Sequence, residues 1–222
     1  MINLVAFDWN GTIFADTKAI FESNGKSLKI LNLKPISFND FQKYYDVPIK
    51  KFFLALGAKE TDLDSKAGEV INAFQSVYEK RVAKVRTRAN VRQLLEFLSN
   101  EKIEAIIFSN HIRESILSHL DRLKIQNYFT EVLANSHLDL PLKGRNKNEK
   151  LKAFMEKKNL SPDEVLIIGD TIEEVEIGKE LGCYTVAITH GNCSTSRLKK
   201  AKPDFLVNSL KRVSHIIKLK AS

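Results

Sequence analysis

Three residues of types that bind phosphate or metal follow directly after apolar runs in the sequence: Asp8, Ser109 and Asp170. A carboxylate at the buried end of a strand is costly unless it is paired, protonated or bound to a cation. Two carboxylates that converge from neighbouring strands therefore predict a site for a divalent metal ion. Because the candidate ligands are all oxygen atoms, this site favours Mg²⁺ over Zn²⁺.

The strands that would deliver these residues alternate with helices along the chain. Apolar runs predict strands at Asn3–Phe7, Glu104–Phe108, Glu131–Ala134, Val165–Ile168, Tyr184–Ile188 and Phe205–Val207. Helical periodicity predicts helices at Ala89–Ser99, Ile112–Leu123, Asn148–Lys158, Ile172–Leu181 and from Leu210, with a loop at His137–Asn146. This alternation is typical of an α/β fold, here a Rossmann-like parallel sheet flanked by helices. Ligands of such sheets bind beyond the carboxyl ends of the strands.

One long segment, from about Asp16 to Lys84, shows only helical patterns. We expect helices at Thr17–Leu33, after Ser37 as N-cap, at Ile49–Leu56 up to Gly57, and at Leu63–Val82. The sequence therefore predicts a Rossmann-like core formed by residues 1–15 and 85–222. An all-helical cap, residues 16–84, is expected to be inserted into it.

Composition limits the class of protein. The 222 residues are 43% apolar, which suffices for one core and a smaller module. The net charge is +8, but Lys and Glu are interspersed, as in residues 147–158, so we expect no nucleic-acid partner. The apolar run Ile2–Phe7 is too short for a signal peptide, and no run reaches membrane-spanning length. With only two cysteines, the chain is predicted to be cytoplasmic, without a membrane partner.

Four short motifs occur in order along the chain. They are Asp8-Trp9-Asn10-Gly11-Thr12, then Ser109, then a lysine, then Gly169-Asp170 with Glu174. Together they resemble the signature of the haloacid dehalogenase-like superfamily, in particular its phosphoglycolate-phosphatase-like branch with a helical cap. The resemblance spans nearly the whole chain. It implies a sheet of order 5-4-1-2-3 and a cap that closes over the site.

The resemblance also implies roles for the acidic residues. Asp8 would attack phosphorus and form an aspartyl-phosphate, which divides one hard displacement into two easier ones. Mg²⁺ would be held by Asp8, by the backbone carbonyl of Asn10 and by Asp170. Glu174 stands where the family usually has Asp. It would reach the metal directly, act through a water or contact Lys147 instead.

The other motifs imply phosphate-binding groups. The Ser109 hydroxyl and the backbone N–H of Asn110, at the expected start of a helix, would bind phosphoryl oxygens. The family also needs a lysine near the nucleophile, and Lys143, Lys147 and Lys150 are candidates. We favour Lys147 for its position before the Val165–Ile168 strand, with Lys143 as the runner-up.

Contacts to the rest of the substrate are less specific. Gly11 and Thr12 form the turn after the nucleophile, and His111 follows Ser109 closely. Tyr44 and Tyr45 lie in the expected cap and would face the leaving group, a small phosphorylated metabolite. The alternative is that both tyrosines only pack the cap helices and that His111 is a surface residue.

Asn10 departs from the family pattern, in which a second Asp protonates the leaving oxygen. An amide has no proton to give in this range, and the lost step is worth about 10²- to 10⁴-fold. Three explanations stay open: the protein acts on easily expelled leaving groups, it borrows another acid, or it carries a substitution made to trap a complex. A phosphonate hydrolase would need a Schiff-base lysine, for which Lys43, Lys50 and Lys51 are candidates.

The resulting prediction is an Mg²⁺-dependent phosphatase that acts on a small phosphate monoester. The second hypothesis is a binding or regulatory protein with low turnover. A metal-free dehalogenase is less favoured, because Asp170 and Glu174 are of the metal-binding type.

Overall fold

The strands of the protein form one parallel sheet of six. The computed structural model describes residues 1–136 and 146–221. The strands are β1 (Leu4–Phe7), β2 (Glu104–Ile112), β3 (Glu131–Asn135), β4 (Val165–Gly169), β5 (Tyr184–Ile188) and β6 (Phe205–Val207). Their order is β3-β2-β1-β4-β5-β6. The predicted α/β fold is confirmed; the five-strand order 5-4-1-2-3 differs only in leaving out β6, which pairs with β5.

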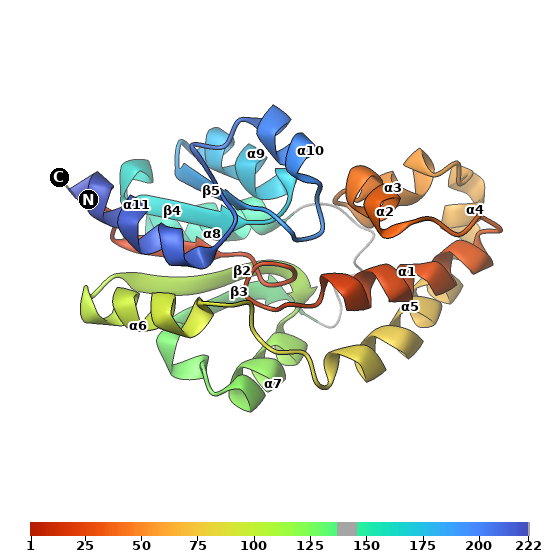
Figure 1. The fold of residues 1–222 in the computed structure, drawn as a ribbon, viewed down its shortest axis with the longest axis horizontal. Coiled ribbons are helices and arrows are strands. Elements are labelled where there is room, and N and C mark those ends of the chain that lie inside the picture. The colour runs from red at the N-terminus through yellow and green to blue at the C-terminus, as the bar shows by residue number, and fades with distance from the viewer. Residues whose placement is uncertain (137–145, 222) are drawn as a thin grey trace.

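Helices cover both faces of this sheet (Figure 1). One face carries α6 (Val91–Asn100), α7 (Arg113–Leu123) and α11 (Val213–Ala221); the other carries α8 (Lys147–Lys157), α9 (Ile172–Leu181) and α10 (Thr195–Ala201). In β1, Val5 and Phe7 belong to the core on the first face, and Leu4 and Ala6 to the core on the second. Burial on both sides explains why this strand has no polar alternation. Helix α10 was not predicted from the sequence.

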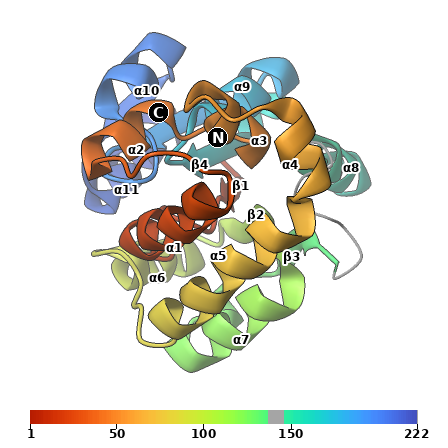
Figure 2. The ribbon, with the colours of Figure 1, turned by 90° about the vertical axis from the view of Figure 1, so that its right-hand side faces the viewer.

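Five helices are inserted between β1 and α6. These inserted helices are α1 (Thr17–Ile30), α2 (Phe38–Tyr44), α3 (Ile49–Ala55), α4 (Glu60–Ser65) and α5 (Ala67–Val82). Helices α1 and α5 pack along each other (Figure 2). Ser37 caps α2 as expected, accepting from the Asp40 N–H at 3.0 Å. The single helix expected at Leu63–Val82 is wrong: Lys66, with ψ of 13°, separates α4 from α5.

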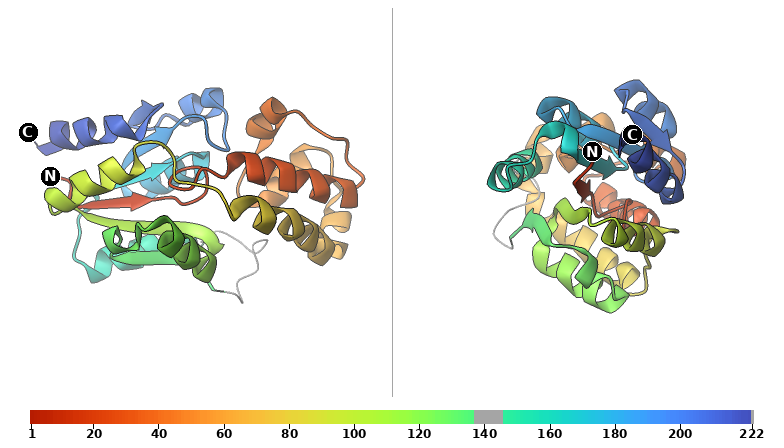
Figure 3. Two further views of the ribbon diagram at one scale, coloured as in Figure 1. Left: turned by 60° about the horizontal axis from the view of Figure 1, so that its bottom comes forward. Right: turned by 90° about the vertical axis from the view of Figure 1, so that its left-hand side faces the viewer.

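The inserted helices lie at the carboxyl ends of the strands, opposite the end where the two termini lie (Figure 3). Hydrogen bonds and an ion pair connect them to the loop after β5 and to α10. Gln42 of α2 donates to the Gly191 carbonyl at 2.6 Å and accepts from the Ser194 N–H at 2.9 Å. Arg197 pairs with Asp46 at 3.1 Å. Among the described residues, no helix has both the length and the apolar character needed to cross a membrane.

Candidate functional site

Asp8 follows β1 and meets Lys147, the first residue of α8. The Lys147 Nζ lies 2.6 Å from Asp8 Oδ1 and also contacts the Glu174 carboxylate. The ammonium group sits 4.4 Å from the centroid of the Phe108 ring, and Lys147 is only 1% exposed. Burial lowers the pKa of Lys147, but Asp8 and Glu174 more than offset this and raise it above its usual value. Lys147 is therefore a fixed, buried cation.

The other two candidate lysines are not placed at Asp8. Lys143 lies outside the described residues. Lys150, one helical turn after Lys147, donates to the Ala134 carbonyl at 2.9 Å and to Asn135 Oδ1 at 2.7 Å. Of the candidates within the described residues, the structure brings Lys147 to Asp8.

Glu174 joins Lys147 to the start of α9. Its Oε1 contacts Lys147, and its Oε2 accepts from the Thr171 N–H at 3.1 Å and hydroxyl at 2.6 Å. Burial raises the pKa of Glu174, but Lys147 and Thr171 outweigh it and hold the pKa below its usual value. The structure shows the contact with Lys147, the third expected arrangement, while metal binding by Glu174, directly or through a water, stays a prediction.

Asp170 follows β4 and is held by two turns. Its Oδ1 accepts from the Thr12 hydroxyl at 3.0 Å, and its Oδ2 from the Asn192 N–H at 2.5 Å. A Cβ on Gly11 or Gly191 would lie 2.4 or 2.2 Å from Asp170 Oδ2, so the close approach requires glycine at both positions. Gly11 and Thr12 do not line the cavity described below. In the structure both residues position Asp170, and their role in substrate binding stays a prediction.

Negative charge is in excess at this end of the sheet. The buried carboxylates are Asp8, Asp16, Asp170, Glu173 and Glu174. The cations that act on them are Lys147 and Arg88, which also donates to the Gly11 and Thr189 carbonyls at 2.6 and 2.7 Å. Burial, then Glu174, raises the pKa of Asp170 to about 7, and burial raises that of Asp8 well above its usual value. Added positive charge would therefore stabilise the site.

The donor set fits Mg²⁺. Asp8 and Asp170 offer two carboxylates, and the Asn10 carbonyl lies 3.5 Å from Nδ2 of Asn192, whose backbone N–H contacts Asp170. The buried Asn192 Oδ1 has no hydrogen-bond partner within the described part of the chain, as expected of an acceptor for a metal-bound water. Within residues 1–136 and 146–221, no cluster of three or more His, Cys, Asp or Glu side chains is arranged to hold a metal ion. Mg²⁺ commonly takes only one or two carboxylates and keeps several waters.

The Asn10 side chain is fixed by residues that sequence reasoning missed. Its Nδ2 donates to Asp16 Oδ2 at 2.6 Å and to the Tyr78 hydroxyl oxygen at 2.9 Å. Tyr78 and the Gly11 N–H donate to Asp16 at 2.6 and 2.8 Å. Burial raises the pKa of Asp16 to about 6, although these hydrogen bonds lower it. In the sequence, Asp16 resembles the N-cap of a helix. Nothing in the sequence around Tyr78 marks it as a site residue, because it reaches the site only through the position of α5.

The strand that bears Ser109 is longer than expected. An irregular register between Phe108 and Ile112 keeps β2 extended up to Ile112, and α7 begins at Arg113. Ser109 and Asn110 therefore lie in the strand, and their expected place at a helix N-terminus is wrong. The Asn110 side chain donates to Glu173 at 2.8 Å.

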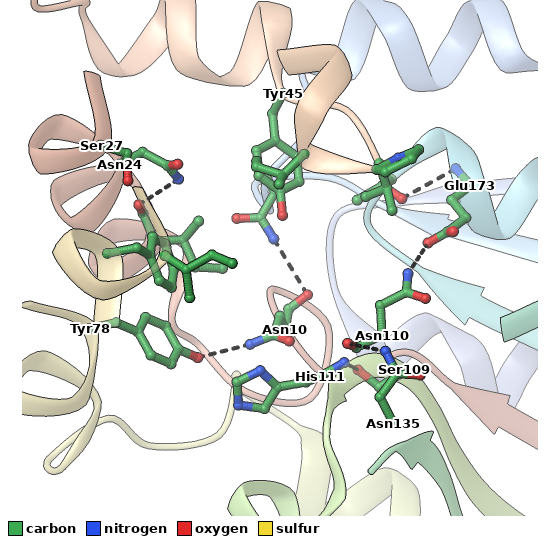
Figure 4. A pocket seen from close by; sticks show the side chains of 18 of the residues that line it. Asn10, Asn24, Ser27, Tyr45, Tyr78, Ser109, Asn110, His111, Asn135 and Glu173 are labelled. Atoms are coloured by element: carbon green, nitrogen blue, oxygen red, sulfur yellow. Dashed lines mark hydrogen bonds between the residues drawn. The ribbon is translucent and has the colours of Figure 1, made fainter. Parts of the chain in front are cut away.

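A cavity of about 210 Å³, the site cavity, separates these residues from the inserted helices. It is lined from the sheet by Asp8, Asn10, Ser109, Asn110 and His111, and Tyr45 and Tyr78 reach it from the inserted helices (Figure 4). Tyr44 does not line it; the Lys43 ammonium lies 5.0 Å from its ring centroid. His111 is neutral at pH 7, because burial lowers its pKa to about 4.

Known proteins resemble this chain over its full length. It is 23% identical to a phosphoglycolate phosphatase of Vibrio parahaemolyticus, covering 99% of this chain and 98% of the relative. It is 26% identical to one of Aquifex aeolicus, covering 98% and 96%, and 23% identical to the pyrophosphatase PpaX of Oceanobacillus iheyensis, covering 97% of both.

Solved structures share the fold. A crystal structure described as a predicted phosphatase from Clostridium acetobutylicum matches with a TM-score of 0.80 at 21% identity, covering 99% of both chains. A haloacid dehalogenase-like hydrolase from Streptococcus pneumoniae matches with a TM-score of 0.71 at 20% identity, covering 97% of this chain and 98% of the other. The family model for haloacid dehalogenase-like hydrolases matches residues 5–188. With its parallel sheet and the residues gathered at its carboxyl end, the chain belongs to the haloacid dehalogenase-like hydrolases.

Proposed function

We propose that this protein is an Mg²⁺-dependent phosphatase that hydrolyses a small phosphate monoester through an aspartyl-phosphate on Asp8. The observation that supports this most is the placement of Asp8, which lines the site cavity while its Oδ1 contacts the buried Lys147. The phosphoglycolate phosphatases and the pyrophosphatase among the relatives support the same class of reaction.

In this proposal an Asp8 oxygen forms a bond to phosphorus while the bond from phosphorus to the leaving oxygen breaks. Water then cleaves the aspartyl-phosphate, which releases phosphate and restores Asp8. Lys147 orients Asp8 and offsets the charge of the intermediate, and the Ser109 hydroxyl holds a phosphoryl oxygen. Mg²⁺, held by Asp8, Asp170 and the Asn10 carbonyl, would screen the negative charges of nucleophile and phosphate. Residues 16–84 act as a cap that excludes water.

Cation binding is expected to depend on pH, because Asp8 and Asp170 must lose their protons to bind Mg²⁺. The pKa of Asp170 is raised to about 7 and that of Asp8 well above its usual value. Protons compete with the metal below these values, so Mg²⁺ affinity should rise as pH rises from 6 to 8. Titration calorimetry in two buffers of different ionisation enthalpy checks this by counting the protons released. An affinity independent of pH would contradict it.

The proton for the leaving oxygen cannot come from Asn10. The Asn10→Asp variant alone would place a second carboxylate against Asp16, whose oxygen now lies 2.6 Å from the Asn10 amide. Two carboxylates at that distance cannot both ionise, so this variant should lose stability between pH 5 and pH 8.

The exchange Asn10→Asp with Asp16→Asn keeps one carboxylate and one amide in contact. We expect it to recover stability and to raise kcat by about 10²- to 10⁴-fold over the natural chain. Thermal unfolding and steady-state rates of both variants check this. An unchanged kcat in a folded exchange variant would mean that the chemistry does not depend on an acid at position 10.

A second candidate is a low-turnover protein that binds a phosphorylated metabolite. The observation that favours it is the Asn10 amide, which is held by Asp16 and Tyr78 where the family has its acid. The phosphonate hydrolase receives no such support. Lys50 pairs at 2.8 and 2.9 Å with Glu60 and Asp64, and no lysine lines the site cavity among the described residues.

Phosphate release from a panel of monoesters, with Mg²⁺ and with a chelator, tests the first candidate. We expect release only with Mg²⁺, and a phosphoryl group on the peptide containing Asp8 when turnover is quenched and the protein is analysed by mass spectrometry. A folded protein that binds Mg²⁺ and phosphate but releases none would favour the second candidate.

A further inference from the structure

The wall of the site cavity opposite Asp8 is largely apolar. It is formed by side chains from α1, α3 and α5: Ile20, Ile49, Phe53, Val70, Ile71 and Phe74. Such a wall gains free energy by covering apolar surface of a ligand and offers little to a solvated group. The leaving group of a bound ester would lie against this wall, because Asp8 and Ser109 are on the other side.

Polar groups on this wall are mostly used within the protein. The Ser27 hydroxyl donates to the Val70 carbonyl at 3.1 Å, and the Asn24 Nδ2 to the Ile20 carbonyl at 2.9 Å. The buried Asn24 Oδ1 has no hydrogen-bond partner in the described part of the chain. It is an acceptor, which suits a hydroxyl or amide group and repels an anion. Gln75 is a further neutral polar side chain on the wall.

The site cavity also lacks a cation to pair with a second anionic group. Its lining, as far as the described residues go, contains no Lys or Arg, and its acidic members are Asp8, Glu173 and Glu174. Lys147 lies behind Asp8 and is 1% exposed. Among the described residues, a carboxylate or phosphate on the leaving group would find no cationic partner to offset the loss of its water, which is strongly unfavourable.

The volume limits the size of the leaving group. An apolar cavity of about 150 Å³ holds one benzene molecule. The site cavity, at about 210 Å³, must hold a phosphoryl group as well. The space left suits a group no larger than a six-membered ring or a short alkyl chain.

From this wall we propose that the substrate is a phosphate monoester whose leaving group is uncharged, largely apolar and no larger than about a six-membered ring. The inference rests on the phosphatase proposed above. It predicts that phosphoglycolate and pyrophosphate, whose leaving groups are anionic, are poor substrates of this chain.

The test compares kcat/KM, with Mg²⁺ present, for methyl, ethyl, propyl and butyl phosphate, phosphoglycolate and pyrophosphate. The alkyl esters have leaving oxygens of similar basicity, so their differences report contact with the wall. We expect kcat/KM to rise about threefold to fourfold with each added CH₂. Butyl phosphate should exceed phosphoglycolate by at least about tenfold in kcat/KM. Pyrophosphate, whose leaving phosphate is expelled far more easily than an alkoxide, is compared by KM, which should be higher than that of butyl phosphate.

Two other outcomes overturn the inference in distinguishable ways. If phosphoglycolate is the better substrate, or if pyrophosphate has the lower KM, the proposed leaving group is wrong while the phosphatase stands. If no ester is hydrolysed faster than by the Asp8→Asn variant, the proposed function fails as well.

A matched pair of variants tests the wall itself. Gln75→Lys adds a cation to the wall, and Asn72→Lys adds the same charge on an exposed position of α5, outside the site cavity. We expect the ratio of kcat/KM for phosphoglycolate to that for butyl phosphate to rise about tenfold in Gln75→Lys only. Equal ratios in two folded variants, checked by thermal unfolding, would show that the wall does not select the leaving group.

Discussion

Replacing Asp8 by asparagine is expected to lower kcat by at least about 10⁴-fold, because the amide cannot form the covalent bond to phosphorus. The change preserves the shape of the side chain and removes one of the crowded carboxylates. Lys147 keeps its contact with Glu174, so the fold should be retained. Steady-state phosphate release and thermal unfolding of the two proteins measure both effects.

Asp163→Asn provides the matched control, since Asp163 is an exposed carboxylate outside the site cavity. Its kcat should stay within about twofold of the natural chain. If Asp8→Asn retained more than a tenth of the natural kcat, Asp8 would not be the nucleophile and the proposed reaction would be wrong.

The Lys147→Met variant should lose both stability and turnover. Removing the ammonium leaves Asp8, Glu173 and Glu174 buried without their common cation, and breaking a buried pair costs about 3–5 kcal/mol. Without Lys147 the pKa of Asp8, which burial already raises, rises further, and the pKa of Glu174 rises because burial is no longer offset by the ammonium group. Their ionisation is then disfavoured in the folded state, so the variant should become less stable as pH rises from 5 to 8. Denaturant unfolding at several pH values measures this.

Lys150→Met is the control for the loss of a lysine from the same helix. Lys150 donates to the Ala134 carbonyl and to Asn135, so its loss should cost about 1 kcal/mol. Because it contacts neither Asp8 nor Glu174, its unfolding should show a much smaller dependence on pH. Similar pH profiles for the two variants would contradict the special role of Lys147.

The sequence predicts the positions where strands end better than the contacts made there. The bounds of β5, β6 and α9 match their predictions, because each is a compact apolar or periodic run closed by polar or turn residues. Asp8 and Asp170 follow β1 and β4 as expected, since a buried parallel strand is apolar throughout. That Asp8 and Asp170 lie together at the carboxyl end of the sheet was therefore predictable.

Contacts between distant parts of the chain were not predictable in the same way. Tyr78 reaches Asp16 and Asn10 only because α5 packs along α1, and no local pattern encodes that orientation. Asn192 reaches Asp170 through its backbone N–H, which any residue except proline could provide. The extension of β2 depends on an irregular register with β3, which hydrophobic periodicity does not report.

The attachment of α2 to the loop after β5 has a consequence for how a ligand enters. Gln42 and the Arg197–Asp46 pair form a latch between the inserted segment and the residues after β5, with both ion-pair partners partly open to solvent. Partly solvated contacts of this kind are each worth about 1 kcal/mol, so releasing the latch is a small thermal step. Salt would weaken its charged half. The rate at which a ligand enters the site cavity, unlike the rate of the chemical step at Asp8, should therefore respond to ionic strength.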